Sequence, residues 1–211
     1  AIFMAPPVFF DLSRLTGDPR YAEFAHEEFW ATTEYLYNED EHLYLRDSRY
    51  FERRDDEGRL IYWGRGNGWT LAGIARILDQ MPEDFEEREG YERIYREMAA
   101  RLVKLQHADG NWRSSLLARD EAPAPESSGT GLLVFALAWG LNNGLLEGEQ
   151  YRQSVELGWG ALVNAVQPSG KLGWVQQVGF APGSATAEDT QLYGVGALLL
   201  AASEVYPMSR R

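Results

Sequence analysis

Four apolar segments rich in small residues recur along the chain. They cover residues 3–15, 68–78, 129–141 and 193–205. Equivalent small residues in them, Ala5, Gly68, Gly131 and Gly196, are separated by 63, 63 and 65 residues. Long segments with few charges predict helices that are buried on all sides. Recurrence at a nearly fixed interval is typical of a repeat architecture.

Each of the first three apolar segments is followed by a turn and then by an amphipathic, acidic segment. These amphipathic helices are predicted to follow the turns at 16–21, 82–84 and 148–151, and to end near residues 37, 105 and 166. Each is followed in turn by a loop with a short aromatic stretch, at 41–44, 109–112 and 169–174. Buried helices that alternate with half-exposed ones predict an all-α toroid of helical hairpins, with an inner and an outer ring.

Composition narrows the class of protein. The 211 residues are 45% hydrophobic, which is ample for one domain with a large core. The net charge of −12 argues against nonspecific binding to nucleic acid or anionic membranes. The chain contains no cysteine, which excludes disulfides and thiol chemistry. Residues 1–10 lack the features of a signal peptide and suggest the interior of a longer protein.

The segment Trp63-Gly-Arg-Gly-Asn-Gly-Trp69 concentrates unusual residues. We expect it to form a tight loop that leads into a helix N-terminus, where free N–H groups favour an anion. Arg65 supplies a planar cation that matches a carboxylate, and the two indoles supply flat apolar surface. The segment therefore predicts a site for an acidic sugar. The alternative is a glycine turn with packing tryptophans and a surface arginine.

The starts of the inner helices are predicted to share one end of the toroid, because inner helices run in the same direction. The segments that precede them are 63–69, 125–131 and 187–190. Converging N-termini favour an anion at a common mouth. Ser127 or Ser128 is the expected N-cap of the third inner helix. Glu126 and Asp189 also lie at this mouth, either in the site or as caps.

The Trp63–Trp69 segment closely resembles the W-x-R-G-N-G-W signature of the unsaturated uronyl hydrolases of glycoside hydrolase family 105, to which family 88 is related. Four further segments are similar to segments of that family in the same order: 1–7, 43–50, 126–130 and 193–201. The resemblance implies an (α/α)6 barrel. It also implies that residues 1–211 are the C-terminal part of a single catalytic domain, with about seven helices.

Such enzymes remove a 4,5-unsaturated uronic acid from the non-reducing end of lyase-generated oligosaccharides, of pectin/rhamnogalacturonan or ulvan-like origin. An aspartate protonates the vinyl-ether double bond and water adds to the ring. The resemblance places that aspartate just before Ala1, so we assign no catalytic residue in this chain. The alternative is a non-catalytic helical-toroid module that binds acidic glycans. A purely structural solenoid is disfavoured by the glycine- and tryptophan-rich segment.

Six residues are expected to bind substrate: Trp63, Arg65, Asn67, Trp69, Arg46 and Met4. Arg65 is expected to clamp a uronate carboxylate, with an inter-loop salt bridge as the alternative. The two tryptophans are expected to line the sugar site, although one of them could pack in the core. Asn67 is expected either to bond a sugar hydroxyl or to occupy a left-handed turn position.

Arg46 occupies a position where many family members have histidine. With Arg49 nearby, it suits a sulfated or otherwise acidic substrate. The alternative is that both arginines belong to a solvated face with Asp47 and Glu52.

We expect no cofactor and no metal. His42 and His107 lack a partner four residues away, and His26 is expected at the surface. Asp109-Gly110 is expected to form a turn. The expected partner is an unsaturated oligosaccharide, with neither nucleic acid nor membrane. Self-association or pairing with the missing N-terminal part is expected, because an open toroid exposes apolar helices. Degradation of imported oligosaccharides makes the cytoplasm the expected compartment.

Overall fold

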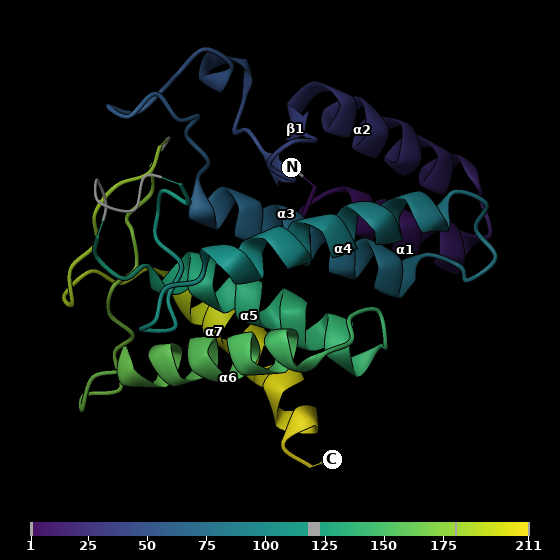
Figure 1. The fold of residues 1–211 in the computed structure, drawn as a ribbon. Helices are drawn as coiled ribbons and strands as arrows, with labels where there is room; N and C mark the ends of the chain where they lie inside the picture. The colour runs from purple at the N-terminus through teal and green to yellow at the C-terminus, as the bar shows by residue number, and fades with distance from the viewer. Residues whose placement is uncertain (1, 118–122, 180, 211) are drawn as a thin grey trace.

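The computed structural model describes residues 2–117, 123–179 and 181–210, and these residues are predominantly helical (Figure 1). The elements are α1 (Pro6–Thr16), α2 (Arg20–Leu36), β1 (Tyr37–Asn38), β2 (Leu43–Tyr44), the 3₁₀ helix η1 (Ser48–Tyr50), α3 (Gly64–Gln80), α4 (Arg88–Leu105), α5 (Ser127–Asn142), α6 (Glu149–Asn164) and α7 (Leu192–Met208). The predicted all-α class is confirmed. No helix in the described ranges is both long enough and apolar enough to cross a bilayer.

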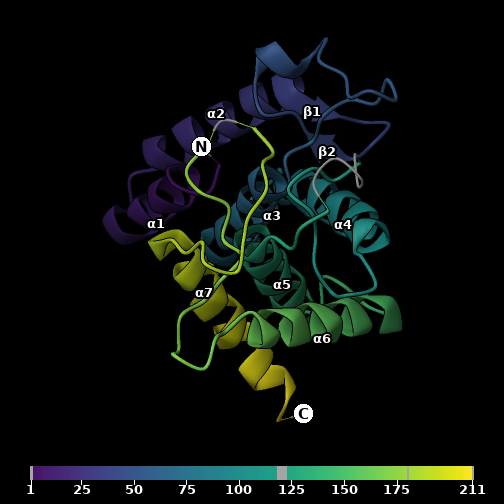
Figure 2. The ribbon, with the colours of Figure 1, turned by 90° about the vertical axis from the view of Figure 1, so that its left-hand side faces the viewer.

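The helices form the two predicted layers (Figure 2). In the inner layer, α3 packs against α1 and α5, and α5 packs against α7. In the outer layer, α2, α4 and α6 pack against α1, α3 and α5, respectively. Every residue from Ser127 to Gly140 of α5 is buried, as expected for an almost uncharged helix enclosed by neighbours.

The expectation that inner helices are buried on all sides is wrong for α1 and α7. In α7, only Gly194, Ala197 and Ala201 are buried, whereas Leu192 and Leu199 are 90% and 64% exposed. The physical reason is that these two helices are the first and the last of the inner layer, where α1 packs against α3 and α7 packs against α5. Each helix thus contacts one inner neighbour among the described elements, and its other face is open. Self-association through these faces remains a prediction.

Two predicted boundaries also differ. The Trp63–Trp69 segment is not a loop, because Trp63 is the N-cap residue of α3 and the other six residues form its first turns. Its glycines permit close contact rather than a turn, since a Cβ at Gly64 would lie 2.3 Å from the carbonyl oxygen of Arg113. The outer helix α4 begins at Arg88 and not near Asp84. Residues 82–88 form successive turns instead, in which Phe85 and Arg88 donate backbone hydrogen bonds three residues back.

The recurring turn after each outer helix is confirmed. After α2, β1 and β2 pair antiparallel across a turn in which His42 has φ 52°. After α4 and α6, the turns contain Gly110 and Gly170 with φ 84° and 83°. These left-handed positions suit glycine. The first turn matters for the site, because it directs the segment after β2 back toward the start of α3, which contacts β2.

Two glycines of α6 provide a test of the contact between the layers. Gly158 is buried against α5, and a Cβ there would lie 2.5 Å from Cγ2 of Val134. We expect Gly158→Ala to lower the free energy of unfolding by about 1–3 kcal/mol, because valine has a stiff side chain and cannot yield easily. Urea denaturation would measure this change.

Gly160→Ala is the matched control. Gly160 lies two residues further along α6, is exposed, and has no atom within 4 Å of a built Cβ. Alanine there is expected to raise stability by up to about 1 kcal/mol through helix propensity. Equal effects at the two positions would contradict the described packing of α6 on α5.

Candidate functional site

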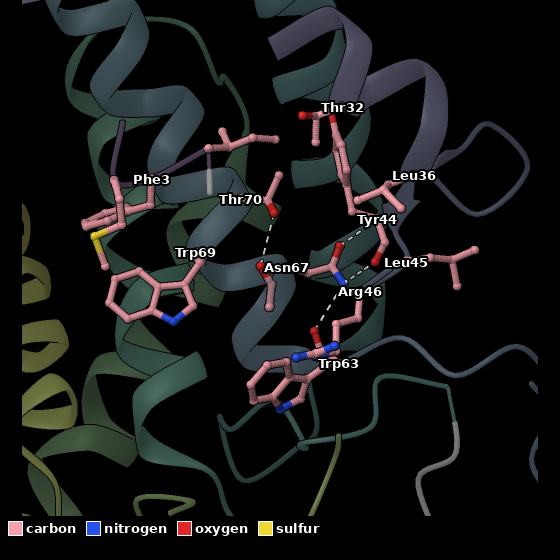
Figure 3. Close-up of a pocket in the computed structure, with 13 residues that line it drawn as sticks. Phe3, Thr32, Leu36, Tyr44, Leu45, Arg46, Trp63, Asn67, Trp69 and Thr70 are labelled. Atoms are coloured by element: carbon pink, nitrogen blue, oxygen red, sulfur yellow. Dashed lines mark hydrogen bonds between the residues drawn. The ribbon is translucent and has the colours of Figure 1, made fainter. Parts of the chain in front are cut away.

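A cavity of about 260 Å³ lies where the start of the chain, α2 and the segment after β2 meet the first turns of α3 (Figure 3). It is lined by Ile2, Phe3, Met4, Thr32, Leu36, Tyr44, Leu45, Arg46, Trp63, Gly66, Asn67, Trp69 and Thr70. Five of the six predicted site residues are therefore brought together: Met4, Arg46, Trp63, Asn67 and Trp69. Arg65 is not among the lining residues.

The cavity has aromatic walls at both ends. Phe3 and Trp69 lie at one end and form an edge-to-face pair with ring centroids 4.6 Å apart. Trp63 lies at the other end with Asn67 and Arg46 (Figure 3). Both tryptophans are partly buried, and Trp69 also packs against the hydrophobic core, as the alternative expected for one of them. Flat rings exposed in a cavity can pack against the apolar faces of a sugar ring.

The wall formed by residues 2–4 rests directly on α3. A Cβ at Gly73 would lie 2.8 Å from both the backbone N and the Cα of Phe3. The absence of a side chain at Gly73 therefore allows the two backbones to approach, which brings Phe3 within reach of Trp69.

Asn67 fixes the opposite wall. It is 1% exposed, and its Oδ1 accepts a 2.8 Å hydrogen bond from the backbone N–H of Tyr44. Its Nδ2 donates to the carbonyl oxygens of Tyr44 and Trp63, both at 3.1 Å. Asn67 lies within α3, so the left-handed turn alternative is wrong. The Asn67 side chain bonds both backbone groups of Tyr44, as a neighbouring strand would. A contact between Asn67 and a sugar hydroxyl remains a prediction.

Arg46 supplies positive charge at the edge of the cavity. Its Nη1 donates to Oδ2 of Asp47, and Arg49 donates to both carboxylate oxygens through Nε (3.0 Å) and Nη2 (2.8 Å). The hydrogen bond from Arg49 lowers the pKa of Asp47 to about 2. Two guanidinium groups and one carboxylate thus leave one net positive charge at neutral pH. Arg46 faces the cavity, whereas the Arg49 side chain is 69% exposed and fits the solvated-face alternative.

Arg65 lies behind Trp63 and is only 4% exposed. Its guanidinium lies 4.7 Å from the ring centroid of Trp63 and 4.8 Å from that of Tyr193. Nη1 donates to the carbonyl oxygen of Gln176 at 2.6 Å, and Nη2 donates to that of Gln177 at 3.1 Å. Further contacts of Nη1 reach the hydroxyls of Tyr193 at 3.3 Å and Ser128 at 3.4 Å.

This geometry does not support direct contact between Arg65 and a uronate carboxylate, because the donors are turned toward the protein. It does not support the salt-bridge alternative either, because the hydrogen-bond acceptors among the described residues are neutral oxygens. The predicted convergence of helix N-termini is confirmed at this point. Ser128 belongs to the first turn of α5 and Tyr193 to that of α7, and both contact Arg65 of α3.

Glu126, and neither serine, is the N-cap of α5. Its carboxylate accepts hydrogen bonds from the N–H groups of Ser128 (3.1 Å) and Gly129 (2.7 Å). Ser127 instead donates its hydroxyl to the carbonyl oxygen of Gly173, and Ser128 donates its hydroxyl to Glu126. The carboxylate of Glu126 is a stronger acceptor for the helix N–H groups than a serine hydroxyl, which explains why the prediction of a serine N-cap is wrong.

Asp189 closes the turn before α7. Its Oδ2 accepts 2.8 Å hydrogen bonds from the N–H and the hydroxyl of Thr186. These bonds hold its pKa below the usual range. Asp189 thus acts in a turn rather than as a helix cap.

The lining side chains in the described part of the chain include no carboxylate and no histidine. No three potential metal-ligating side chains gather there or elsewhere in those ranges. His26 is partly exposed on α2, which agrees with its predicted surface position, and its ring contacts the hydroxyl of Tyr91. Asp109 accepts a hydrogen bond from the N–H of Asn111 in the turn at Gly110, as predicted. The polar side chains that line the cavity are hydroxyl, amide and guanidinium groups.

Sequence reasoning missed two contributions. Thr32 and Leu36 of α2 line the cavity, and only their spacing of four residues on one helix indicated a shared face. Gln176 links the converging helices and has no recognisable local signal, because its role depends on contacts with residues 50 to 113 positions earlier.

An arc of helical hairpins with an aromatic-walled cavity at its inner helix starts defines the class of helical-toroid proteins. The sequence model described as Glycosyl Hydrolase Family 88 matches residues 1–209, and the chain belongs to this family. Family 88 is the related family named above. The narrower assignment to family 105 is not shown, because solved structures described as possible members of that family are only about 20% identical and show the fold alone.

Two curated relatives carry the name unsaturated 3S-rhamnoglycuronyl hydrolase. The protein from Alteromonas sp. is 44% identical over 205 residues, which cover 97% of this chain and 50% of the relative. The protein from Formosa agariphila is 41% identical over an alignment of 211 positions, which covers 97% of this chain and 56% of the relative. The chain therefore spans about half the length of these relatives.

A solved structure described as a glycosyl hydrolase family 88 protein from Bacteroides vulgatus has the same fold. It is 34% identical, with a TM-score of 0.93 over 98% of this chain and 61% of that one.

The buried position of Arg65 leads to a prediction about stability. Arg65→Met is expected to lower the free energy of unfolding by about 1–3 kcal/mol, because it removes the charged hydrogen bonds to the carbonyl oxygens of Gln176 and Gln177. Thermal and urea denaturation would measure the loss.

Arg14→Met is the control for removal of an arginine. The Arg14 side chain is 57% exposed and forms a surface ion pair with Asp11. Its loss is expected to change stability by less than about 0.5 kcal/mol. Arg65→Met with the stability of the unchanged protein would contradict a structural role for the Arg65 hydrogen bonds.

Proposed function

We propose that the protein containing this chain is a glycoside hydrolase that removes a 4,5-unsaturated uronic acid from the non-reducing end of lyase-generated oligosaccharides. The observation that carries this proposal is the cavity in which five of the six expected substrate-binding residues meet, in a chain of family 88. Two relatives named for hydrolysis of such substrates support it.

The cavity suits a ring that is apolar on its faces and acidic at its edge. Trp63 and Trp69 supply flat surfaces, and Arg46 supplies a cation. Arg65 lies directly behind Trp63, and the positive field of a buried guanidinium is weakly screened, so it also favours an anion in the cavity. The role we propose for Arg65 is thus to position Trp63 and to add positive potential, in place of a direct clamp.

The chemistry requires an acid that the described lining residues do not supply. The resemblance places an aspartate just before Ala1, and Ile2, Phe3 and Met4 already form part of the cavity wall. We propose that this aspartate reaches the cavity and transfers a proton to the vinyl-ether double bond, while water adds to the ring. The hydrated sugar then rearranges and the glycosidic linkage breaks. This is general acid–base catalysis.

The proposed activity can be tested with the full-length protein and unsaturated disaccharides prepared with glucuronan, pectin and ulvan lyases. The ultraviolet absorbance of the enol ether is expected to fall as the double bond is hydrated. Binding without any loss of absorbance on all these substrates would favour the non-catalytic glycan-binding alternative. Loss on only one substrate class would identify the uronic acid.

We also propose that the Arg46 end of the cavity accepts a second anionic group, such as a sulfate. The one net positive charge on Arg46, Asp47 and Arg49 supports this specificity. If it is correct, Arg46→Met raises KM for a sulfated unsaturated disaccharide by about tenfold or more, with a smaller effect on the unsulfated analogue. Steady-state kinetics on the two substrates would measure the difference.

Arg49→Met is the matched control for Arg46→Met. Arg49 pairs with the same carboxylate but its side chain is 69% exposed, so its loss is expected to raise KM by less than about threefold. Equal effects on both substrates in Arg46→Met would exclude a sulfate contact.

The pH dependence follows from the depressed pKa of Asp47. Because the pKa of Asp47 is lowered to about 2, Asp47 is ionised above about pH 4, and the net charge of the three residues is constant there. Affinity for a sulfated ligand is therefore expected to be flat between about pH 4 and pH 8. Isothermal titration calorimetry across that range would measure it.

We further propose that the substrate is an imported oligosaccharide met in the cytoplasm, which cell fractionation would test. The open faces of α1 and α7 support self-association, or pairing with a further part of the protein, as a second proposal.

A further inference from the structure

Gln176 lies outside the cavity, yet it contacts the residue that forms one of its walls. Its Oε1 accepts a 2.9 Å hydrogen bond from the indole N–H of Trp63. Gln176 is 4% exposed and is not among the residues that line the cavity. The indole has a single donor, so this bond fixes the direction in which the edge of the ring points.

Each polar group of Gln176 forms a hydrogen bond within the protein. Its backbone N–H donates to Oε1 of Glu126 at 3.1 Å, and its Nε2 donates to the carbonyl oxygen of Ala181 at 2.8 Å. Its carbonyl oxygen accepts from Arg65 at 2.6 Å and from the hydroxyl of Tyr193 at 2.5 Å. Burial raises the pKa of Tyr193, so its hydroxyl keeps the proton that it donates.

The contacts of Gln176 therefore join three inner helices to one aromatic side chain. Glu126 is the N-cap of α5, Tyr193 lies in the first turn of α7, and Arg65 lies in the first turn of α3. Trp63 is the N-cap residue of α3, and one face of its ring is covered by the Arg65 guanidinium. The ring is thus fixed by its N–H at the edge and by Arg65 at one face, and its position against the cavity follows from both.

We infer that Gln176 is a positioning residue for substrate binding, which acts by holding the Trp63 indole in the orientation that a sugar ring packs against. The expected effect of Gln176 on turnover rests on the proposed function. Its effect on the orientation of Trp63 rests only on the contacts described above. A flat platform must be held in place before the ligand arrives, because ordering it afterwards would reduce affinity. The expected effect is therefore on KM more than on kcat.

The test uses Gln176→Met in the full-length protein, because methionine has a similar length and its sulfur is only a weak hydrogen-bond acceptor. KM for the unsaturated disaccharide is expected to rise about threefold to tenfold, the effect of one hydrogen bond, while kcat changes by less than about twofold. Gln176→Glu keeps an oxygen for the indole and is expected to give a KM between those of the unchanged protein and Gln176→Met. Gln177→Met is the matched control, since that side chain is exposed and contacts Asp189 and Gln191 instead.

A double-mutant cycle separates positioning of Trp63 from a general loss of structure. In a Trp63→Phe background the indole donor is absent, so Gln176→Met is expected to change KM by less than about twofold further. An unchanged KM in Gln176→Met, or an equal rise in both backgrounds, would overturn the inference.

A second readout does not depend on turnover. The indole N–H signal of Trp63 in a ¹H–¹⁵N spectrum, assigned by its absence in Trp63→Phe, is expected to shift in Gln176→Met and to stay in place in Gln177→Met. If no unsaturated uronide is turned over by the unchanged protein, the proposed function fails. The spectrum still decides whether Gln176 holds Trp63, and an unmoved signal would exclude it.

Discussion

The burial of one guanidinium among neutral oxygens is the constraint on which the site depends. A buried cation is costly unless its hydrogen bonds are satisfied, and Arg65 meets this requirement with backbone carbonyls and hydroxyls from three separate segments. These segments must therefore arrive together at the start of α3. The same contacts place Trp63, because the guanidinium covers one face of its ring. Folding of the inner layer and formation of the cavity wall are thus coupled at a single residue.

Asn67 performs the corresponding task for the outer segments. The turn between β1 and β2 is short, and on its own a two-stranded ribbon of this size is marginal. Asn67 supplies the donor and the acceptor that a third strand would supply to Tyr44. The residues after Tyr44, including Arg46, are consequently carried to the cavity. Asn67 and Arg65 are two residues apart in the Trp63–Trp69 segment, which explains why so short a stretch organises so much of the structure.

The inner helices and most of the expected cavity residues could be predicted from the sequence. The inner helices were predictable because they carry few charges, α5 above all. Their number was predictable because small residues recur at a nearly constant interval. Residues that line the cavity were predictable because Trp63, Asn67 and Trp69 lie on one short segment. Their local conformation was not, because three glycines suggest a turn, whereas here they permit backbone contact such as that of Gly64 with Arg113. The position of Arg65 behind the wall could not be predicted, since its acceptors lie more than 60 residues away.

The two ends of the cavity are supported by different contacts. The Phe3–Trp69 end is supported by a backbone seated on a bare glycine, and Met4 beside it is 60% exposed. The Trp63 end is supported by hydrogen bonds that pass through the inner helices. Because the supports are separate, a change of side chain at Met4 leaves the other end mechanically undisturbed. Under the proposed function, the Met4 end of the cavity can therefore vary among homologues while the aromatic wall at Trp63 keeps its place.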